Sequence, residues 1–240
     1  MALEGLKFLY WGYFNLLENE SKDDIVKRCI DLAYVDATNQ GSFNTRADDT
    51  ARLSSAYNHI CEAILSTLIF NYDEWHDNLC RQLLDDYKDI KNRKTGQNAF
   101  TYGNAQKWVN MSVKYLYLIR SIVSSFSGCS VDFCNFYDEK FKPHEDEFHV
   151  PIDSFIIEAI WPIKAISGEC DWLPGAKFTR NNHPYLGPYK SDHCKAWSNF
   201  NDTEYFSVRD HVRTLVKAGS KKPLEWENEE WINIAKKRKT

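Results

Sequence analysis

The sequence has little glycine and proline: its 240 residues include ten glycines and seven prolines. Collagen-like and low-complexity chains are therefore excluded, and a β-sandwich or β-barrel is disfavoured because it needs many tight turns. No run of about 18 apolar residues is present, so we expect no membrane partner. The hydrophobic content of 43% is enough to fill a core, which excludes disorder over the whole length.

The sequence also lacks an excess of positive charge. Its net charge is −4, so any site for a polyanion must come from a local patch. Neither GxxxxGK[ST] nor GxGxxG is present, which argues against a nucleotide-binding fold. The first 17 residues do not read as a signal peptide, and the seven cysteines are odd in number and widely spaced. We therefore expect a cytoplasmic protein with reduced thiols.

Apolar residues recur at helical spacing along most of the chain. The expected helices cover residues 3–17, 21–32, 51–70, 73–90, 105–123, 151–160, 202–218 and 227–236. We predict an all-α fold, with one compact helical body over 1–240. This body could consist of two helical subdomains, about 1–98 and 99–240, with the active-site cleft between them. Serine, cysteine and acidic residues dominate segment 124–148, which predicts an irregular insertion loop.

Two short motifs support a functional hypothesis. Residues 101–116 read TYGNAQKWVNMSVKYL, where a turn around Gly103 and Asn104 is expected to lead into a helix that carries Lys107. The positive end of a helix dipole disfavours an ammonium group, and Schiff-base chemistry requires an uncharged amine. Residues 149–160 read HVPIDSFIIEAI and place the Asp153 carboxylate at the start of an apolar helix. Taken one at a time, both residues are also compatible with ordinary solvated helix ends.

Together the two motifs resemble those of the helix-hairpin-helix DNA glycosylase superfamily, in particular its 8-oxoguanine glycosylase branch with lyase activity. The resemblance implies a compact helical fold, DNA as the partner and no cofactor. It implies that Lys107 attacks C1′ of a flipped nucleotide, and that Asp153 stabilises the developing sugar cation and assists proton transfer. The implied function is excision of a damaged or modified base, with or without AP lyase activity, in repair or in defence against modified foreign DNA.

The glycosylase hypothesis also suggests which residues contact DNA. Hairpin N–H groups would hold phosphates, aided by nearby basic side chains. The candidate backbone contacts are Gly103, Asn104, Lys91, Arg93, Lys94 and Lys114. By resemblance, aromatic side chains near the C-terminus would line the base pocket, and an amide in a glycine-containing loop could read a base edge. The candidate base contacts are Trp226, Trp231, Glu227 and Gln40.

Two alternatives stay open at this stage. Cysteine and histidine side chains in and beside the expected insertion have nearly the spacing of a Cys2His2 zinc site, which would order that segment. The candidate ligands are Cys129, Cys134, His144 and His149. The second alternative is a helical interaction protein without enzymatic activity, whose aromatic surfaces bind a protein partner. In that protein Lys107 and Asp153 would be ordinary helix-end residues.

Overall fold

In the computed structural model of the protein, the described residues are 3–16, 20–38, 50–90, 99–124, 130–160, 167–169, 177–179, 197–237 and 239. The chain divides into two compact units. The first contains Met1–Phe100 and Ala105–Phe148, and the second contains Thr101–Asn104 and His149–Thr240. The expected boundary near residue 98 is therefore wrong for Ala105–Phe148, because this segment belongs to the first unit.

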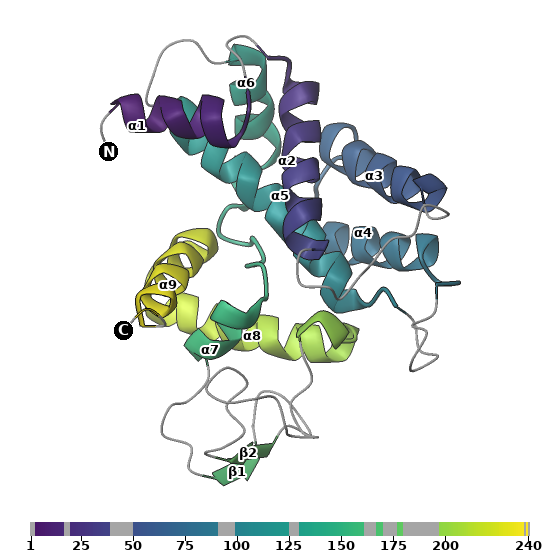
Figure 1. Ribbon diagram of the computed structural model, residues 1–240, viewed down its shortest axis with the longest axis vertical. Coiled ribbons are helices and arrows are strands. Elements are labelled where there is room, and N and C mark those ends of the chain that lie inside the picture. Colours follow the sequence, from purple (N-terminus) through teal and green to yellow (C-terminus); the bar gives the residue numbers. More distant parts are fainter. Residues whose placement is uncertain are drawn as a thin grey trace. The chain divides into compact units, whose positions relative to one another are not determined.

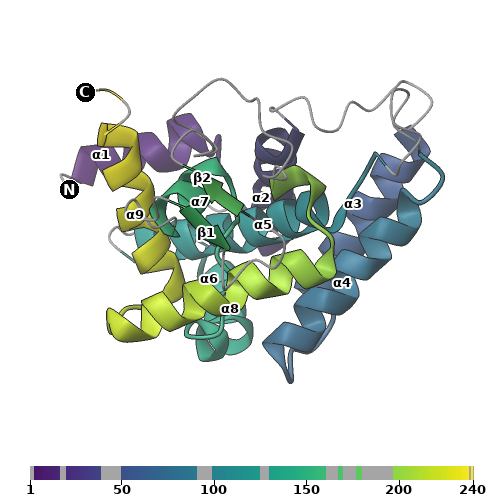
Figure 2. The same ribbon diagram turned by 90° about the horizontal axis from the view of Figure 1, so that it is seen from below.

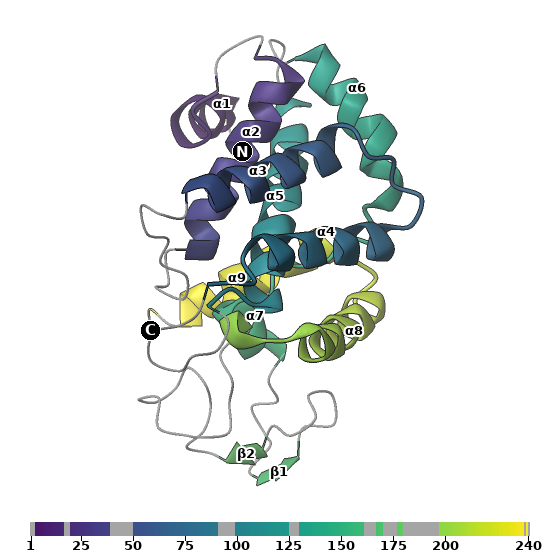
Figure 3. The same cartoon turned by 90° about the vertical axis from the view of Figure 1, so that its right-hand side faces the viewer.

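The first unit is built of helices. Its elements are α1 (Leu3–Phe8), the π-helix η1 (Leu9–Tyr13), α2 (Lys22–Thr38), α3 (Thr50–Leu65), α4 (Tyr72–Asp86), most of α5 (Tyr102–Val123), α6 (Val131–Lys140) and the 3-10 helix η3 (Lys142–His144). Helix α2 packs against α3 and α6, and α3 packs against α4 (Figures 1 and 3). The indole N–H of Trp108 on α5 donates to the Ile30 carbonyl of α2 at 3.1 Å. Helix α5 therefore forms part of the core of this unit.

The second unit begins with the first residues of α5 and contains α7 (Ser154–Ile160), the 3-10 helix η4 (Trp197–Asn199), α8 (Asp202–Ala218) and α9 (Pro223–Lys237). Helix α9 packs against α7 and meets α8 at the turn that joins them (Figure 2). Strands β1 (Ser167–Glu169) and β2 (Lys177–Thr179) form a small antiparallel pair, with Gly168 opposite Phe178. Apart from this pair, the regular elements of the described residues are helices, and the prediction of an all-α fold is confirmed.

Segment 124–148 is not the irregular loop that its composition predicted, because it contains α6 and η3. The hydroxyl of Ser130 accepts a hydrogen bond from the Phe133 backbone N–H at 3.2 Å and caps the start of α6. Phe133, Tyr137 and Phe141 follow at intervals of four residues and are fully buried. This helical stripe was overlooked because serine and acidic residues occupy the positions around it.

Arg120 connects the end of α5 to α6. Its Nε and Nη2 atoms lie 3.0 Å and 2.7 Å from the two carboxylate oxygens of Asp138. This paired hydrogen bonding lowers the pKa of Asp138.

Within the described part of the chain, no helix is long and apolar enough to cross a membrane.

Two buried tyrosines of the first unit make its stability sensitive to alkali. Burial and a hydrogen bond to Asp36 raise the pKa of Tyr115, and burial beside Glu145 raises the pKa of Tyr137. Unfolded tyrosines ionise near pH 10, so the contribution of these two phenols to the free energy of unfolding is complete below about pH 10. Above that pH this contribution falls by about 1.4 kcal/mol per pH unit for each phenol. Urea unfolding between about pH 10 and 11.5 measures this slope.

The variant Tyr137→Phe keeps the aromatic ring and removes the ionisable hydroxyl. We expect its stability to fall less steeply with pH than that of the wild type over the same range. Equal slopes in the two proteins would show that Tyr137 does not contribute to the alkaline loss.

Candidate functional site

The segment that was expected to form a hairpin turn is the first turn of α5. The Thr101 backbone N–H donates to the Asn104 side-chain oxygen at 3.1 Å, and the Asn104 backbone N–H donates to the Thr101 hydroxyl at 3.3 Å. These reciprocal bonds form a capping box in which asparagine takes the usual place of glutamate. The backbone N–H of Gly103 donates to the Phe200 carbonyl at 3.0 Å. The predicted turn at Gly103 and Asn104 is therefore wrong, and these groups are engaged within the protein.

Lys107 lies in the most deeply buried stretch of α5. Every residue from 102 to 113 is buried, and only 6% of Lys107 is exposed. Polar residues share this stretch: the Asn110 amide donates to the Gln106 side-chain oxygen at 3.0 Å, and the Ser112 hydroxyl donates to the Trp108 carbonyl at 2.9 Å. A helix buried on all sides normally carries apolar residues. The group of Gln106, Lys107 and Asn110 therefore marks α5 as a candidate functional element.

Asp153 caps α7 and is also buried. One carboxylate oxygen accepts the backbone N–H groups of Phe155 at 2.9 Å and Ile156 at 3.1 Å, and 8% of the residue is exposed. These two bonds fix the orientation of the carboxylate, as expected for an aspartate at an N-cap. The predicted position of Asp153 at the start of a helix is confirmed.

The predicted base contacts on α9 lie in the same unit as Asp153. Glu227 and Trp226 are buried, whereas Trp231 is 38% exposed. The ring of Trp231 stacks on Phe155 of α7, with ring centroids 4.5 Å apart and an angle of 21° between the planes. Four residues before Asp153 in the sequence, the Nδ1 atom of His149 lies 2.9 Å from the Tyr205 hydroxyl of α8. No sequence pattern predicted this buried pair, which connects the segment before α7 to α8.

The other predicted site residues are distributed as follows. Lys107 belongs to the first unit and Asp153 to the second, so their joint action stays a prediction. Lys114 lies half-buried on α5, in the first unit. The remaining candidates lie outside the described residues: Gln40, Lys91, Arg93, Lys94 and Cys129.

The two histidines among the proposed zinc ligands have other bonding partners. His144 donates from Nε2 to the Ile69 carbonyl at 3.1 Å, and its Nδ1 lies 2.9 Å from a Glu147 carboxylate oxygen. His149 belongs to the other unit, and burial raises the pKa of the Cys134 thiol, which opposes the thiolate that zinc requires. Across the described ranges, no group of three or more histidine, cysteine, aspartate or glutamate residues is arranged to hold a metal. The described residues therefore give the zinc hypothesis no support.

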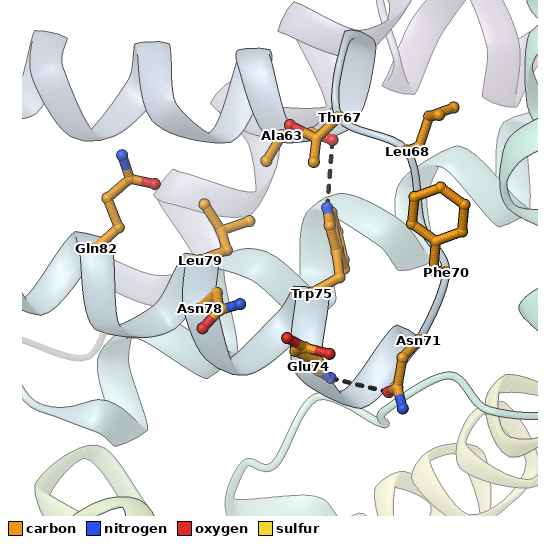
Figure 4. Close-up of a pocket in the computed structure, with 10 residues that line it drawn as sticks. All are labelled: Ala63, Thr67, Leu68, Phe70, Asn71, Glu74, Trp75, Asn78, Leu79 and Gln82. Carbon is orange, nitrogen blue, oxygen red and sulfur yellow. Dashed lines mark hydrogen bonds between the residues drawn. The ribbon is translucent and has the colours of Figure 1, made fainter.

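A pocket that the sequence analysis did not anticipate lies where α3 ends and α4 begins. It has a volume of about 260 Å³ and is lined on one side by Trp75 and Leu79 of α4. Leu68 and Phe70, on the connection between the helices, line its other side (Figure 4). The predicted helix over 51–70 hid this feature, because α3 ends at Leu65.

The chain was compared with family models, with curated proteins and with solved structures. None of the three comparisons gives a match.

Proposed function

We propose that the protein is a DNA glycosylase with AP lyase activity, which removes a damaged or modified base with Lys107 as nucleophile and Asp153 as the stabilising carboxylate. The observation that supports this proposal most is the burial of both ionisable side chains. Buried lysine and aspartate residues are uncommon because withdrawing charge from water is costly, and ionisable groups in such environments concentrate at functional sites. Lys107 and Asp153 are also the two residues that the motif resemblance marks.

The proposed reaction uses the amine and the carboxylate at different atoms of the sugar. The Lys107 nitrogen forms a bond to C1′ as the bond between C1′ and the base breaks. The base leaves with the electron pair of that bond and takes up a proton, while the Asp153 carboxylate offsets the positive charge that develops on the sugar. Ring opening then gives a Schiff base, and elimination of the 3′ phosphate breaks the strand.

Borohydride trapping on a duplex with one abasic site tests the role of Lys107 without knowledge of the excised base. Borohydride reduces the Schiff base to a stable amine, so the wild-type protein is expected to form a covalent adduct with the DNA. Lys107→Ala is expected to reduce this adduct to background, because its side chain has no nitrogen to bond C1′. Denaturing gel electrophoresis of the labelled DNA measures the adduct.

Lys27→Ala is the matched control. Lys27 is an exposed lysine on α2 of the same unit, and its replacement is expected to leave the adduct at the wild-type level. An equal adduct yield from the wild type and Lys107→Ala would reject Lys107 as the nucleophile. Absence of an adduct with the wild type would reject the lyase activity. Base excision without lyase activity would then be tested with the Asp153 variants.

A further inference from the structure

The pocket between α3 and α4 has a volume that suits a single side chain of a partner protein. Its volume of about 260 Å³ lies below the roughly 300–1,000 Å³ of pockets that enclose a whole small-molecule ligand. Trp75 and Leu79 extend from α4 towards α3 and form an apolar wall (Figure 4). Leu68 is 71% exposed and Phe70 is 88% exposed, which is high for large apolar side chains. A pocket lined by such side chains fits a protruding apolar residue of another protein.

The walls of this pocket are held in place by bonds from other parts of the first unit. The Ala63 carbonyl at the end of α3 accepts hydrogen bonds from the Trp75 indole at 3.3 Å and from the Lys140 ammonium of α6 at 2.9 Å. His144 donates to the Ile69 carbonyl at 3.1 Å and so fixes the backbone between Leu68 and Phe70. Because the backbone is already positioned, a partner would lose little of its binding energy in ordering this surface.

The charge around the pocket indicates the chemistry of the partner. The segment 50–90, which contains α3, α4 and their connection, has seven acidic and three basic side chains. Three of these carboxylates, Asp85, Asp86 and Asp89, lie at or beyond the far end of α4 and not at the pocket. Glu74 lines the pocket itself, beside the amide side chains of Asn71, Asn78 and Gln82. An acidic surface repels nucleic acid and attracts a basic protein segment.

We propose that this pocket binds a basic segment of a partner protein, which inserts one large apolar side chain beside Trp75 and places a cationic side chain near Glu74. The amides of Asn78 and Gln82 are able to donate to and accept from the backbone of such a segment. The inference does not depend on the proposed glycosylase activity, because none of the pocket residues belongs to its predicted site.

Amide NMR of the full-length protein tests this proposal with a synthetic pentapeptide that has one tryptophan between two pairs of lysines. Saturable shifts are expected at Leu68, Phe70 and Asn78. Phe70→Ser is expected to weaken binding about tenfold or more, as for a central contact residue. Glu74→Gln and added salt are expected to weaken binding less, because they reduce only the electrostatic attraction between the pocket and the lysines of the peptide.

Three controls make the result specific. Val131→Ser removes an apolar side chain that is 71% exposed on α6 of the same unit, and this variant is expected to bind the peptide like the wild type. A peptide with glutamates in place of the lysines is expected not to bind. Lys107→Ala is expected to bind normally, which separates this surface from the proposed catalytic activity.

The proposal is overturned if the lysine peptide produces no saturable shift, or if Phe70→Ser binds it as tightly as the wild type. Sedimentation velocity provides a further check. A wild-type dimer that Phe70→Ser converts to a monomer would identify a second copy of this chain, and not a basic partner, as the occupant of the pocket.

Discussion

Asp153→Asn is expected to slow base release by about 10²–10³-fold, the usual cost of removing a group that stabilises transition-state charge. The asparagine side chain is neutral, so it cannot offset the positive charge on the sugar. It nevertheless keeps an oxygen that can accept the backbone N–H groups of Phe155 and Ile156. Because asparagine and aspartate are equally good N-cap residues, the free energy of unfolding is expected to stay unchanged. Single-turnover assays on duplexes with 8-oxoguanine or hydroxymethylcytosine measure the rate.

Comparison with Asp153→Ala separates the two roles of this aspartate. Alanine can neither cap α7 nor stabilise the cation, so this variant is expected to lose the activity and about 1 kcal/mol of stability. Urea unfolding measures the difference between the two variants. If Asp153→Asn keeps full activity on a base that the wild type removes, Asp153 serves only as a helix cap and the proposed mechanism is wrong.

The parts of the fold that depend on local patterns could be predicted from the sequence. The periodicity of 105–123 predicted α5, and Pro151 and Asp153 predicted a helix start close to that of α7. Helix α9 begins at Pro223, four residues before the predicted start at 227. Proline is favoured at the first helical position, because the N–H that it lacks would have no partner within the helix there. Errors of this kind concern the helix ends, where weak local preferences compete.

Features that depend on contacts between distant segments could not be predicted. Lys140 donates to carbonyls at the C-terminal end of α3, more than seventy positions earlier in the chain. Burial lowers the pKa of Lys140 to about 8, a shift that follows from its place against the end of α3. The connection after Leu65 holds Leu68 and Phe70 outward, a placement that hydrophobicity alone does not predict for such side chains. The pocket beside α4 could therefore be identified only from the structure.

The two proposals assign different partners to different surfaces. The proposed glycosylase activity assigns DNA to Lys107 and Asp153, whereas the proposed docking site assigns a basic protein segment to the pocket that Glu74 lines. A DNA-binding protein gains when its acidic surface lies away from the phosphates, because like charges repel. An acidic surface that binds a basic protein is compatible with the proposed action on DNA, because the net charge of −4 is a sum over the whole sequence and does not describe any one surface.

Gly103→Ala is expected to destabilise the second unit by about 3 kcal/mol, the upper end of the usual cost of overpacking. Helix propensity predicts the opposite sign, since alanine is favoured over glycine inside a helix by about 1 kcal/mol. The steric term dominates because a Cβ at this position would collide with the carbonyl oxygen of Trp197 and stand 3.0 Å from its carbonyl carbon. These are backbone atoms, which cannot turn away as a side chain can. Thermal and urea unfolding of the purified variant measure the loss.

Gly219→Ala in the same unit provides the control that decides between steric and conformational causes. Gly219 caps the end of α8 with φ of −82°, and a Cβ there would make ordinary contacts of 3.6 Å with two carbonyl oxygens. Its replacement is expected to be neutral or to stabilise by up to about 1 kcal/mol, because alanine restricts the unfolded chain. If both variants lose stability equally, close packing on η4 is not the reason for Gly103. If only Gly103→Ala does, Gly103 is required for the packing of α5 on η4, and its predicted role in holding a DNA phosphate is no longer needed to explain it.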